Sequence, residues 1–169
     1  MIIVMGIPGA GKSTVLNESI KNSKEWKIIN YGDAMFEIAK KLNLVKHKDE
    51  IRKMPISAQR KVQEEVANYL SKVSPKIILD THCSINTPKG YLPGLPLALL
   101  SKLNVEGLVL IDAPIKNILS RRGADKSRIR DMQKKEELEE HVLLNKAFLS
   151  AYGMVTGAPI IVIQNEDGK

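Results

Sequence analysis

The stretch from Gly6 to Thr14 constrains this chain more than any other feature, because it fits the phosphate-binding loop pattern G-x-x-x-x-G-K-[ST]. The loop directly follows an apolar run, residues 1–5, and leads into a stretch with helical periodicity, residues 13–21. A strand, a glycine-rich turn and a helix in this order gather backbone N–H groups and a positive helix end around an anion. The alternative is a glycine-rich turn with an incidental lysine. We expect phosphate binding.

Within the loop, two side chains have distinct expected tasks. The glycines let the backbone turn its N–H groups inward, Lys12 would reach the terminal phosphates, and Ser13 would hold Mg²⁺.

Composition bounds the class of protein. A chain of 169 residues is long enough for one domain with a sheet between two layers of helices. The net charge of +7 and the pI near 9.4 indicate an anionic partner, which can be a nucleotide, a nucleic acid or an acidic surface. One cysteine, Cys83, excludes an internal disulfide framework, and no apolar run approaches the length of a bilayer span. We therefore expect a cytoplasmic protein without membrane contact.

Strand-like segments alternate with helix-like segments along the rest of the chain. Besides the first apolar run, strands are expected at 26–30, 75–80, 107–112 and 158–163, and helices at 34–42, 57–72, 97–103, 115–122 and 132–155. About five strands separated by helices predict an α/β fold with three layers, in which helices cover both faces of a parallel sheet. We expect residues 1–169 to form one domain.

Two of the expected strands end in a carboxylate, Asp80 and Asp112. The carboxyl ends of parallel strands lie at the same sheet edge as the loop, so Asp80 is predicted to hold Mg²⁺ together with Ser13. The alternative for Asp80 is a turn-forming role. Asp33 is expected to be the N-cap of helix 34–42, and a ligand contact in addition remains open. His82 is expected to interact electrostatically with the Asp80 carboxylate or to contact a substrate phosphate.

Residues 81–96 have no regular periodicity and contain three prolines. We expect a long, rigid connection that forms either a wall of the site or a subunit contact.

Four of the six arginines fall within ten residues: Arg121, Arg122, Arg128 and Arg130. The guanidinium group is a rigid fork of donors that suits phosphate, although the helix dipole also favours the first two at the end of helix 115–122. We expect a short lid near 121–131 that closes on phosphate.

Several motifs together resemble the archaeal-type adenylate kinases. They are the loop at 6–14, N-Y-G-D at 30–33, D-T-H at 80–82, T-P-K-G-Y-L-P-G-L-P at 87–96, D-A-P at 112–114 and I-L-S-R at 118–121. The resemblance implies a P-loop nucleoside monophosphate kinase fold, ATP and AMP as substrates, Mg²⁺, a cytoplasmic location and a homotrimer. The family usually continues past the last strand with a helix that has no counterpart here, and the segment after Arg121 is shorter than in the family.

The resemblance also implies roles for single residues. ATP binding would fall to Gly6, Ile7, Pro8, Gly9, Ala10, Gly11, Lys12, Ser13 and Thr14. AMP binding would fall to Asp33, Arg52, Gln59, Thr81, His82 and Gly90, and catalysis to Lys12, Arg121, Arg128 and Arg130.

Adenylate transfer needs no general base, because an AMP phosphate oxygen is already ionised at neutral pH; alignment and charge neutralisation remain. One rival is a kinase for another nucleotide or for a hydroxyl acceptor, in which case Asp80 would act as base. The other is a nucleotide-gated protein that binds RNA or another protein. Direct RNA recognition is not expected, because aromatic residues make up only 4% of the chain and stacking platforms are scarce.

Overall fold

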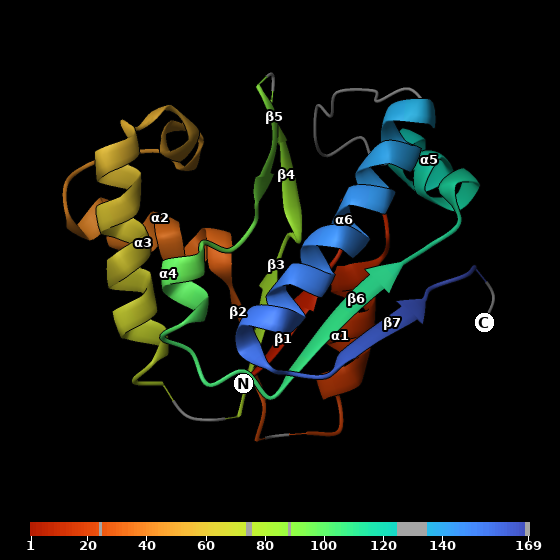
Figure 1. Cartoon of the computed structure of the whole chain (residues 1–169), viewed down its shortest axis with the longest axis horizontal. Coiled ribbons are helices and arrows are strands. Elements are labelled where there is room, and N and C mark those ends of the chain that lie inside the picture. The colour runs from red at the N-terminus through yellow and green to blue at the C-terminus, as the bar shows by residue number, and fades with distance from the viewer. Residues whose placement is uncertain (24, 74–75, 88, 125–134, 168–169) are drawn as a thin grey trace.

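Short apolar runs of the chain form the strands of one parallel sheet. The computed structural model describes residues 1–169 except 24, 74–75, 88, 125–134 and 168–169. Five strands pair in the order β2-β3-β1-β6-β7 (Figure 1). Their bounds are Ile2–Met5 for β1, Lys27–Asn30 for β2, Ile77–Thr81 for β3, Gly107–Asp112 for β6 and Ile160–Gln164 for β7. The predicted five-stranded parallel sheet is thus confirmed.

Helices cover both faces of the sheet. They are α1 (Lys12–Ile20), α2 (Tyr31–Lys41), α3 (Ile56–Leu70), α4 (Leu97–Leu100), α5 (Ile115–Ala124) and α6 (Lys135–Thr156), with a 3₁₀ helix, η1, at Lys48–Lys53. In Figure 1, α6 crosses in front of the sheet and α1 lies behind it. The predicted three-layer arrangement is confirmed, with element ends shifted by a few residues.

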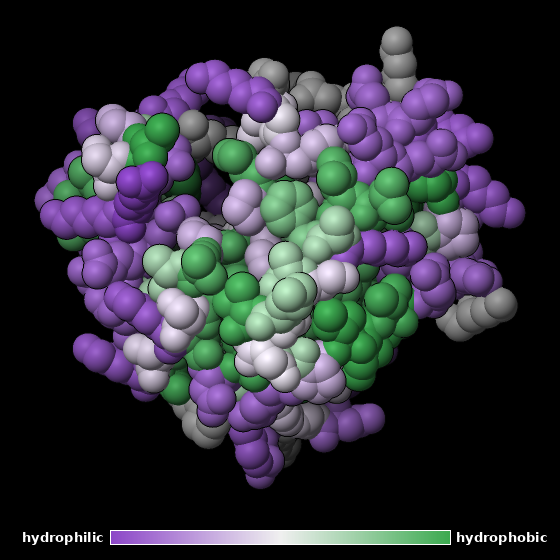
Figure 2. All heavy atoms as spheres, viewed as in Figure 1, coloured by the Kyte–Doolittle hydropathy of each residue, from purple (hydrophilic) through white to green (hydrophobic). Residues whose placement is uncertain are grey.

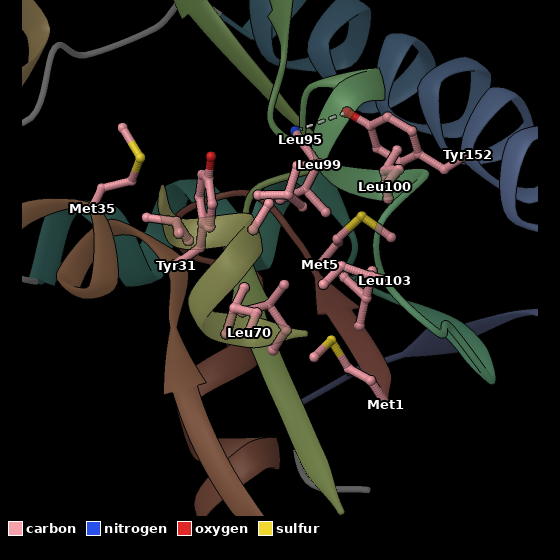
Figure 3. Close-up of a cluster of buried hydrophobic side chains, with 14 of the residues drawn as sticks. Met1, Met5, Tyr31, Met35, Leu70, Leu95, Leu99, Leu100, Leu103 and Tyr152 are labelled. Carbon is pink, nitrogen blue, oxygen red and sulfur yellow. Dashed lines mark hydrogen bonds between the residues drawn. The ribbon is translucent and has the colours of Figure 1, made fainter. Parts of the chain in front are cut away.

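Alternating side chains of the strands fill two separate cores. On β1, Ile3 and Met5 point into a core with α2, α3, α4 and the second half of α6, whereas Val4 points into a core with α1 and α5. Figure 3 shows part of the larger core, which contains Met5, Tyr31, Leu70, Leu95, Leu99 and Tyr152. Burial on both faces explains why the strands are continuously apolar.

The segment 81–96 differs from the irregular connection that the sequence predicts. It contains a two-stranded antiparallel hairpin, β4 (Ser84–Thr87) and β5 (Gly90–Pro93), which rises beyond the end of β3 (Figure 1). Gly90 has a φ of 110°, a conformation that glycine adopts without strain, and the Thr87 hydroxyl donates to the Gly90 carbonyl at 2.7 Å. Strands of four residues with mixed polarity leave too little alternation to detect in the sequence.

Helix α6 holds the base of the hairpin through a row of polar side chains. The Ser84 hydroxyl donates to Asn145 Oδ1 at 2.6 Å, and the Tyr152 hydroxyl donates to the Cys83 carbonyl at 2.7 Å. Tyr152 also accepts from the Leu95 backbone N–H, drawn as the dashed line in Figure 3. The hairpin is therefore anchored to a long helix on its buried side.

Cys83 lies in this anchored region and is expected to be chemically inert in the folded protein. Its side chain is buried, its Sγ donates to the Asn145 carbonyl at 3.1 Å, and burial raises the pKa of the thiol to about 12. Because the thiolate is the reactive form, alkylation by iodoacetamide at pH 8 should be roughly 1,000-fold slower in the native protein than in guanidinium chloride. Mass spectrometry of timed samples measures both rates; comparable rates would contradict the buried placement of Cys83.

The start of α2 corrects a second prediction. Asp33 is not the N-cap: Asn30 is, because its side-chain oxygen accepts a hydrogen bond from the Asp33 backbone N–H at 3.0 Å. Helix α2 therefore begins at Tyr31, three residues earlier than predicted. Asp33 instead lies in the first helical turn, where its exposed carboxylate pairs with Lys48. Its negative charge still interacts favourably with the positive N-terminal end of the helix dipole.

The edge strand β7 has apolar side chains in contact with solvent. Ile160, Ile161, Val162 and Ile163 are each at least 40% exposed. Figure 2 shows hydrophobic residues gathered over this edge and the neighbouring part of α6. Among the residues that the structure describes, no helix is both long and apolar enough to cross a membrane.

Candidate phosphate-binding site

Residues 6–11 join β1 to α1 as a tight loop, and two glycines provide its shape. Gly9 and Gly11 have φ values of 94° and 85°, and Gly11 is the N-cap of α1. Side chains with a Cβ rarely adopt these angles, so the loop requires glycine at both positions. A Cβ on Gly6 would lie 2.7 Å from the Ile111 carbonyl oxygen, so this third glycine permits the close approach of β6.

The same loop is anchored by its apolar residues. Ile7 and Ala10 are buried and pack into the smaller core, together with Leu16 of α1 and Ile118 of α5. The Ala10 N–H donates to the Ile7 carbonyl at 3.1 Å and closes the turn. Pro8 lies exposed between these anchors, so the loop rests on the core through Ile7 and Ala10 while Pro8 faces solvent.

Three side chains from distant segments hold the carbonyl groups of the loop. Arg122 Nε donates to the Pro8 carbonyl at 2.7 Å, Arg121 Nη1 to the Gly9 carbonyl at 3.2 Å, and Asn165 Nδ2 to the Ala10 carbonyl at 2.8 Å. In a planar trans peptide the N–H points opposite to the C=O. The Gly9 N–H therefore points away from Arg122 and the Gly11 N–H away from Asn165; an anion-binding nest would use such N–H groups.

Lys12 and Asp80 form an ion pair beside the loop. Lys12 Nζ contacts Asp80 Oδ1, and the two side chains are only 11% and 12% exposed. Burial lowers the pKa of Lys12 to about 8, and a neighbouring anion favours its charged form. Here Asp80 is that anion, and a phosphate in the loop would be another. Lys12 is thus held in the first turn of α1, close to the site where phosphate charge would lie.

Asp80 and Ser13 offer the donor chemistry that Mg²⁺ prefers. Mg²⁺ takes oxygen ligands and is usually bound by one or two carboxylates or hydroxyls together with substrate phosphates. The Asp80 carboxylate lies at the end of β3, and Ser13 is exposed in the first turn of α1. The described residues contain no group of three or more histidine, cysteine or acidic side chains that could hold a metal alone. The oxygen donors therefore fit a Mg²⁺ that is shared with a nucleotide.

The structure places the predicted arginines only in part. Arg121 lies at the end of α5, where it contacts Gly9, donates to the Asn165 carbonyl at 3.1 Å and pairs with Asp167 at 2.5 Å. Arg128 and Arg130, with most of the predicted lid, lie outside the described residues. In the described part of the chain, Arg121 and its neighbour Arg122 are thus the arginines of this cluster that contact the phosphate loop.

The residues predicted to bind AMP fall into two groups. Thr81 and His82 directly follow Asp80, and His82 Nδ1 donates to the Gly6 carbonyl at 3.2 Å, so both adjoin the phosphate loop. The others lie elsewhere. Asp33 is on α2, Arg52 is in η1, Gln59 Nε2 donates to the Met54 carbonyl at 3.0 Å, and Gly90 forms the hairpin turn.

Sequence reasoning missed three residues of the site: Asn30, Arg122 as a loop contact, and Asn165. Asn30 Nδ2 donates to Asp80 Oδ2 at 2.8 Å. Asn30 is the last residue of β2, and Asn165 directly follows the last residue of β7. A polar residue at the end of a strand is the signal that the sequence offers for both. The partners of Arg122 and Asn165 are more than 100 residues away, and nothing local indicates them.

Asn165 gives a prediction on nucleotide affinity. Replacing it with Ala removes the bond to the Ala10 carbonyl and loosens the loop over Gly11, so we expect KM for the nucleotide to rise about 5- to 10-fold, the effect of losing about one hydrogen bond. Initial rates at varied nucleotide concentration measure it. Asn104→Ala, at an exposed position before β6, is the matched control. An unchanged KM in Asn165→Ala would mean that the loop keeps its shape without this bond.

The strand–loop–helix with its buried lysine and carboxylate defines a P-loop phosphotransferase. A family model described as an AAA domain matches residues 5–139. The fold is similar to that of shikimate kinase from Acinetobacter baumannii in complex with shikimate, with a TM-score of 0.59 and 18% identity over 99% of this chain and 84% of that chain. At this identity the likeness concerns the fold alone.

Similar proteins of known name show to which family of P-loop phosphotransferases the chain belongs. The adenylate kinase of Methanopyrus kandleri is 43% identical over 173 residues, which cover 100% of this chain and 91% of the relative. The adenylate kinase of Pyrococcus abyssi is 43% identical over 172 residues, which cover 100% of this chain and 88% of the relative. The chain belongs to the adenylate kinase family.

Proposed function

We propose that this protein transfers the γ-phosphoryl group of ATP to AMP, reversibly, to give two molecules of ADP. The observation that carries this proposal is the buried Lys12–Asp80 pair beside a glycine loop, in a chain whose relatives at 43% identity are adenylate kinases. The loop N–H groups and Lys12 supply fixed positive charge for the phosphates of ATP. Residues 6–14 form the donor half of the site.

The rival reaction, transfer to a hydroxyl group, would place a different demand on Asp80. In that mechanism Asp80 would have to accept the hydroxyl proton. Both of its oxygens are already engaged, one by Lys12 and the other by Asn30. An acceptor phosphate of AMP is ionised at neutral pH and needs no base, so transfer to AMP lets Asp80 serve as a ligand of Mg²⁺ instead.

The acceptor half is assigned to residues at the end of β3, on α2, η1 and α3, and in the hairpin turn. We place the AMP phosphate near Thr81 and His82, which follow Asp80 at the carboxyl edge of β3. The residues assigned to the rest of AMP are Asp33, Arg52, Gln59 and Gly90. This arrangement would bring the two nucleotides to one sheet edge, where alignment for in-line transfer is the main task.

Mg²⁺ would be held by Ser13 and Asp80, and it would neutralise charge on the transferring phosphates. A short lid near 121–131 would add hydrogen-bond donors to the phosphates and exclude water from the site. Its donors would be the side chains of Arg121, Arg128 and Arg130. Arg121 already contacts the loop at Gly9, which supports its place in this set.

We further propose a cytoplasmic homo-oligomer, a trimer by resemblance to the family. The partly exposed isoleucine and valine side chains of β7 support self-association, because contiguous apolar surface of this kind marks contact regions.

Chromatography of nucleotides tests the reaction directly. ATP and AMP at equal concentration with Mg²⁺ should give two ADP for each ATP consumed, and purified ADP alone should give ATP and AMP. Removal of Mg²⁺ with EDTA should stop both directions. Consumption of ATP with release of inorganic phosphate, unaffected by AMP and accompanied by salt-sensitive RNA binding, would instead support the nucleotide-gated binding protein.

A further inference from the structure

Asn30 stands where three parts of the site meet. It is the last residue of β2 and the N-cap of α2, and the sheet register sets it directly beside Asp80 of β3. Its side chain uses both ends. Oδ1 accepts from the Asp33 backbone N–H at 3.0 Å, and Nδ2 donates to Asp80 Oδ2 at 2.8 Å. One side chain therefore joins the start of α2 to the carboxylate.

The Asp80 carboxylate is thereby fixed at both oxygens. Oδ2 accepts from Asn30, on the β2 side, and Oδ1 contacts Lys12, on the α1 side. Asp80 itself is only 8% exposed, so water competes little for either contact. A carboxylate with one partner could rotate about its last side-chain bond; with a partner on each oxygen its plane is set.

We propose that Asn30 is a positioning residue that orients Asp80 for its work with Mg²⁺ and ties that orientation to helix α2. This rests on the proposed function, in which Asp80 is a Mg²⁺ ligand. Hydrogen bonds to metal-binding carboxylates tune the site, and their loss typically costs 10- to 100-fold in metal affinity or activity. Asn30 makes such a bond from the helix that carries Asp33, one of the residues assigned to AMP.

The chemistry of the side chain separates this role from simple helix capping. Asn, Asp and Ser all cap helices well, because each offers an oxygen to the backbone N–H groups. Of these three, Asn alone has in addition an N–H₂ group that can donate to a carboxylate. Asn30→Ser therefore keeps a capping oxygen and loses the amide bond to Asp80, and Asn104→Ser, at an exposed position, is the matched control. Asn30→Asp also keeps the cap, but it sets a second carboxylate against Asp80 and so adds charge repulsion to the loss of the bond.

We expect kcat of Asn30→Ser to fall about 10- to 100-fold, and the Mg²⁺ concentration for half-maximal activity to rise by a similar factor, with KM for ATP changed less than threefold. Asn30→Asp should show a larger loss, because two carboxylates then face each other. The melting temperature of Asn30→Ser should stay close to that of the parent, because the cap remains. In the Asp80→Asn background, Asn30→Ser should have little further effect on kcat, because Asn30 acts through Asp80.

A readout without nucleotide or metal completes the test. The side-chain amide resonances of Asn30 in a ¹H–¹⁵N spectrum, identified by their absence in Asn30→Ser, should shift in Asp80→Asn. Asn30→Ser and Asn30→Asp with kcat and Mg²⁺ dependence within twofold of the parent, while Asp80→Asn loses activity, would overturn the role of Asn30 and leave the proposed function standing. An equal loss from Asn30→Ser in the Asp80→Asn background would also overturn it. If Asp80→Asn itself keeps the parent's Mg²⁺ dependence, the metal role of Asp80 fails, and the role of Asn30 fails with it.

Discussion

Replacing Lys12 with Ala is expected to lower kcat about 1,000-fold or more while the sheet and helices stay folded. Lys12 is the fixed cation of the loop, and removal of one preorganised charge contact of this type typically costs two to three orders of magnitude in turnover. Its side chain is 11% exposed and pairs with Asp80, so the loss leaves Asp80 with Asn30 as its remaining described partner. Initial rates of ADP formation from ATP and AMP measure the change.

A second lysine on the same helix provides the control. Lys21, at the end of α1, is 63% exposed and pairs with Glu18 on the surface. Lys21→Ala removes the same charge from the molecule, yet its kcat should stay within twofold of the parent. Circular dichroism of both variants shows whether the fold is kept. Near-normal turnover of a folded Lys12→Ala would remove the phosphate loop from the mechanism.

Asp80→Asn is expected to have the next largest effect, a fall in kcat of about 100- to 1,000-fold together with loss of the normal Mg²⁺ dependence. The amide keeps the size of the side chain and still accepts one hydrogen bond, but it removes the charge that pairs with Lys12 and that, in the proposed function, would bind the metal. A buried lysine without its anion also tends toward the neutral form, because burial already lowers the pKa of Lys12 to about 8.

The measurement is a Mg²⁺ titration of the initial rate at fixed ATP and AMP. Asp49→Asn, which neutralises an exposed carboxylate of η1, is the matched control and should follow the parent curve. A parent-like titration curve and kcat in Asp80→Asn would contradict the assignment of Asp80 to the metal and to the ion pair.

Much of the fold could be predicted because the strongest signals of the sequence are local. The strands β1, β3 and β6 are largely apolar runs. The glycine-rich loop motif predicts both the turn and the helix that follows it. The same property explains why Asp80 could be predicted at the sheet edge that carries the phosphate loop: the loop follows the buried strand β1, Asp80 lies near the end of the buried strand β3, and parallel strands end at one edge.

Other features depend on choices that the sequence leaves open. Two residues near the start of α2 can cap a helix, and propensity does not choose between Asp33 and Asn30; the register of β2 beside β3 does, because it brings Asn30 next to Asp80. The hairpin was missed because its strands have four residues each and depend on α6 for support. The contacts of Asn165 and Arg122 with the loop arise only when the sheet brings distant segments together.

Acceptor choice is the most direct test of the central claim, that this chain is a nucleotide kinase that joins ATP to AMP. The measurement is kcat/KM for ADP formation from ATP and Mg²⁺ with AMP, CMP, UMP and GMP, each over a range of concentrations. We predict at least a 100-fold preference for AMP, with two ADP formed for each ATP consumed. Equal use of all four acceptors, or ATP consumption that AMP does not stimulate, would contradict the claim.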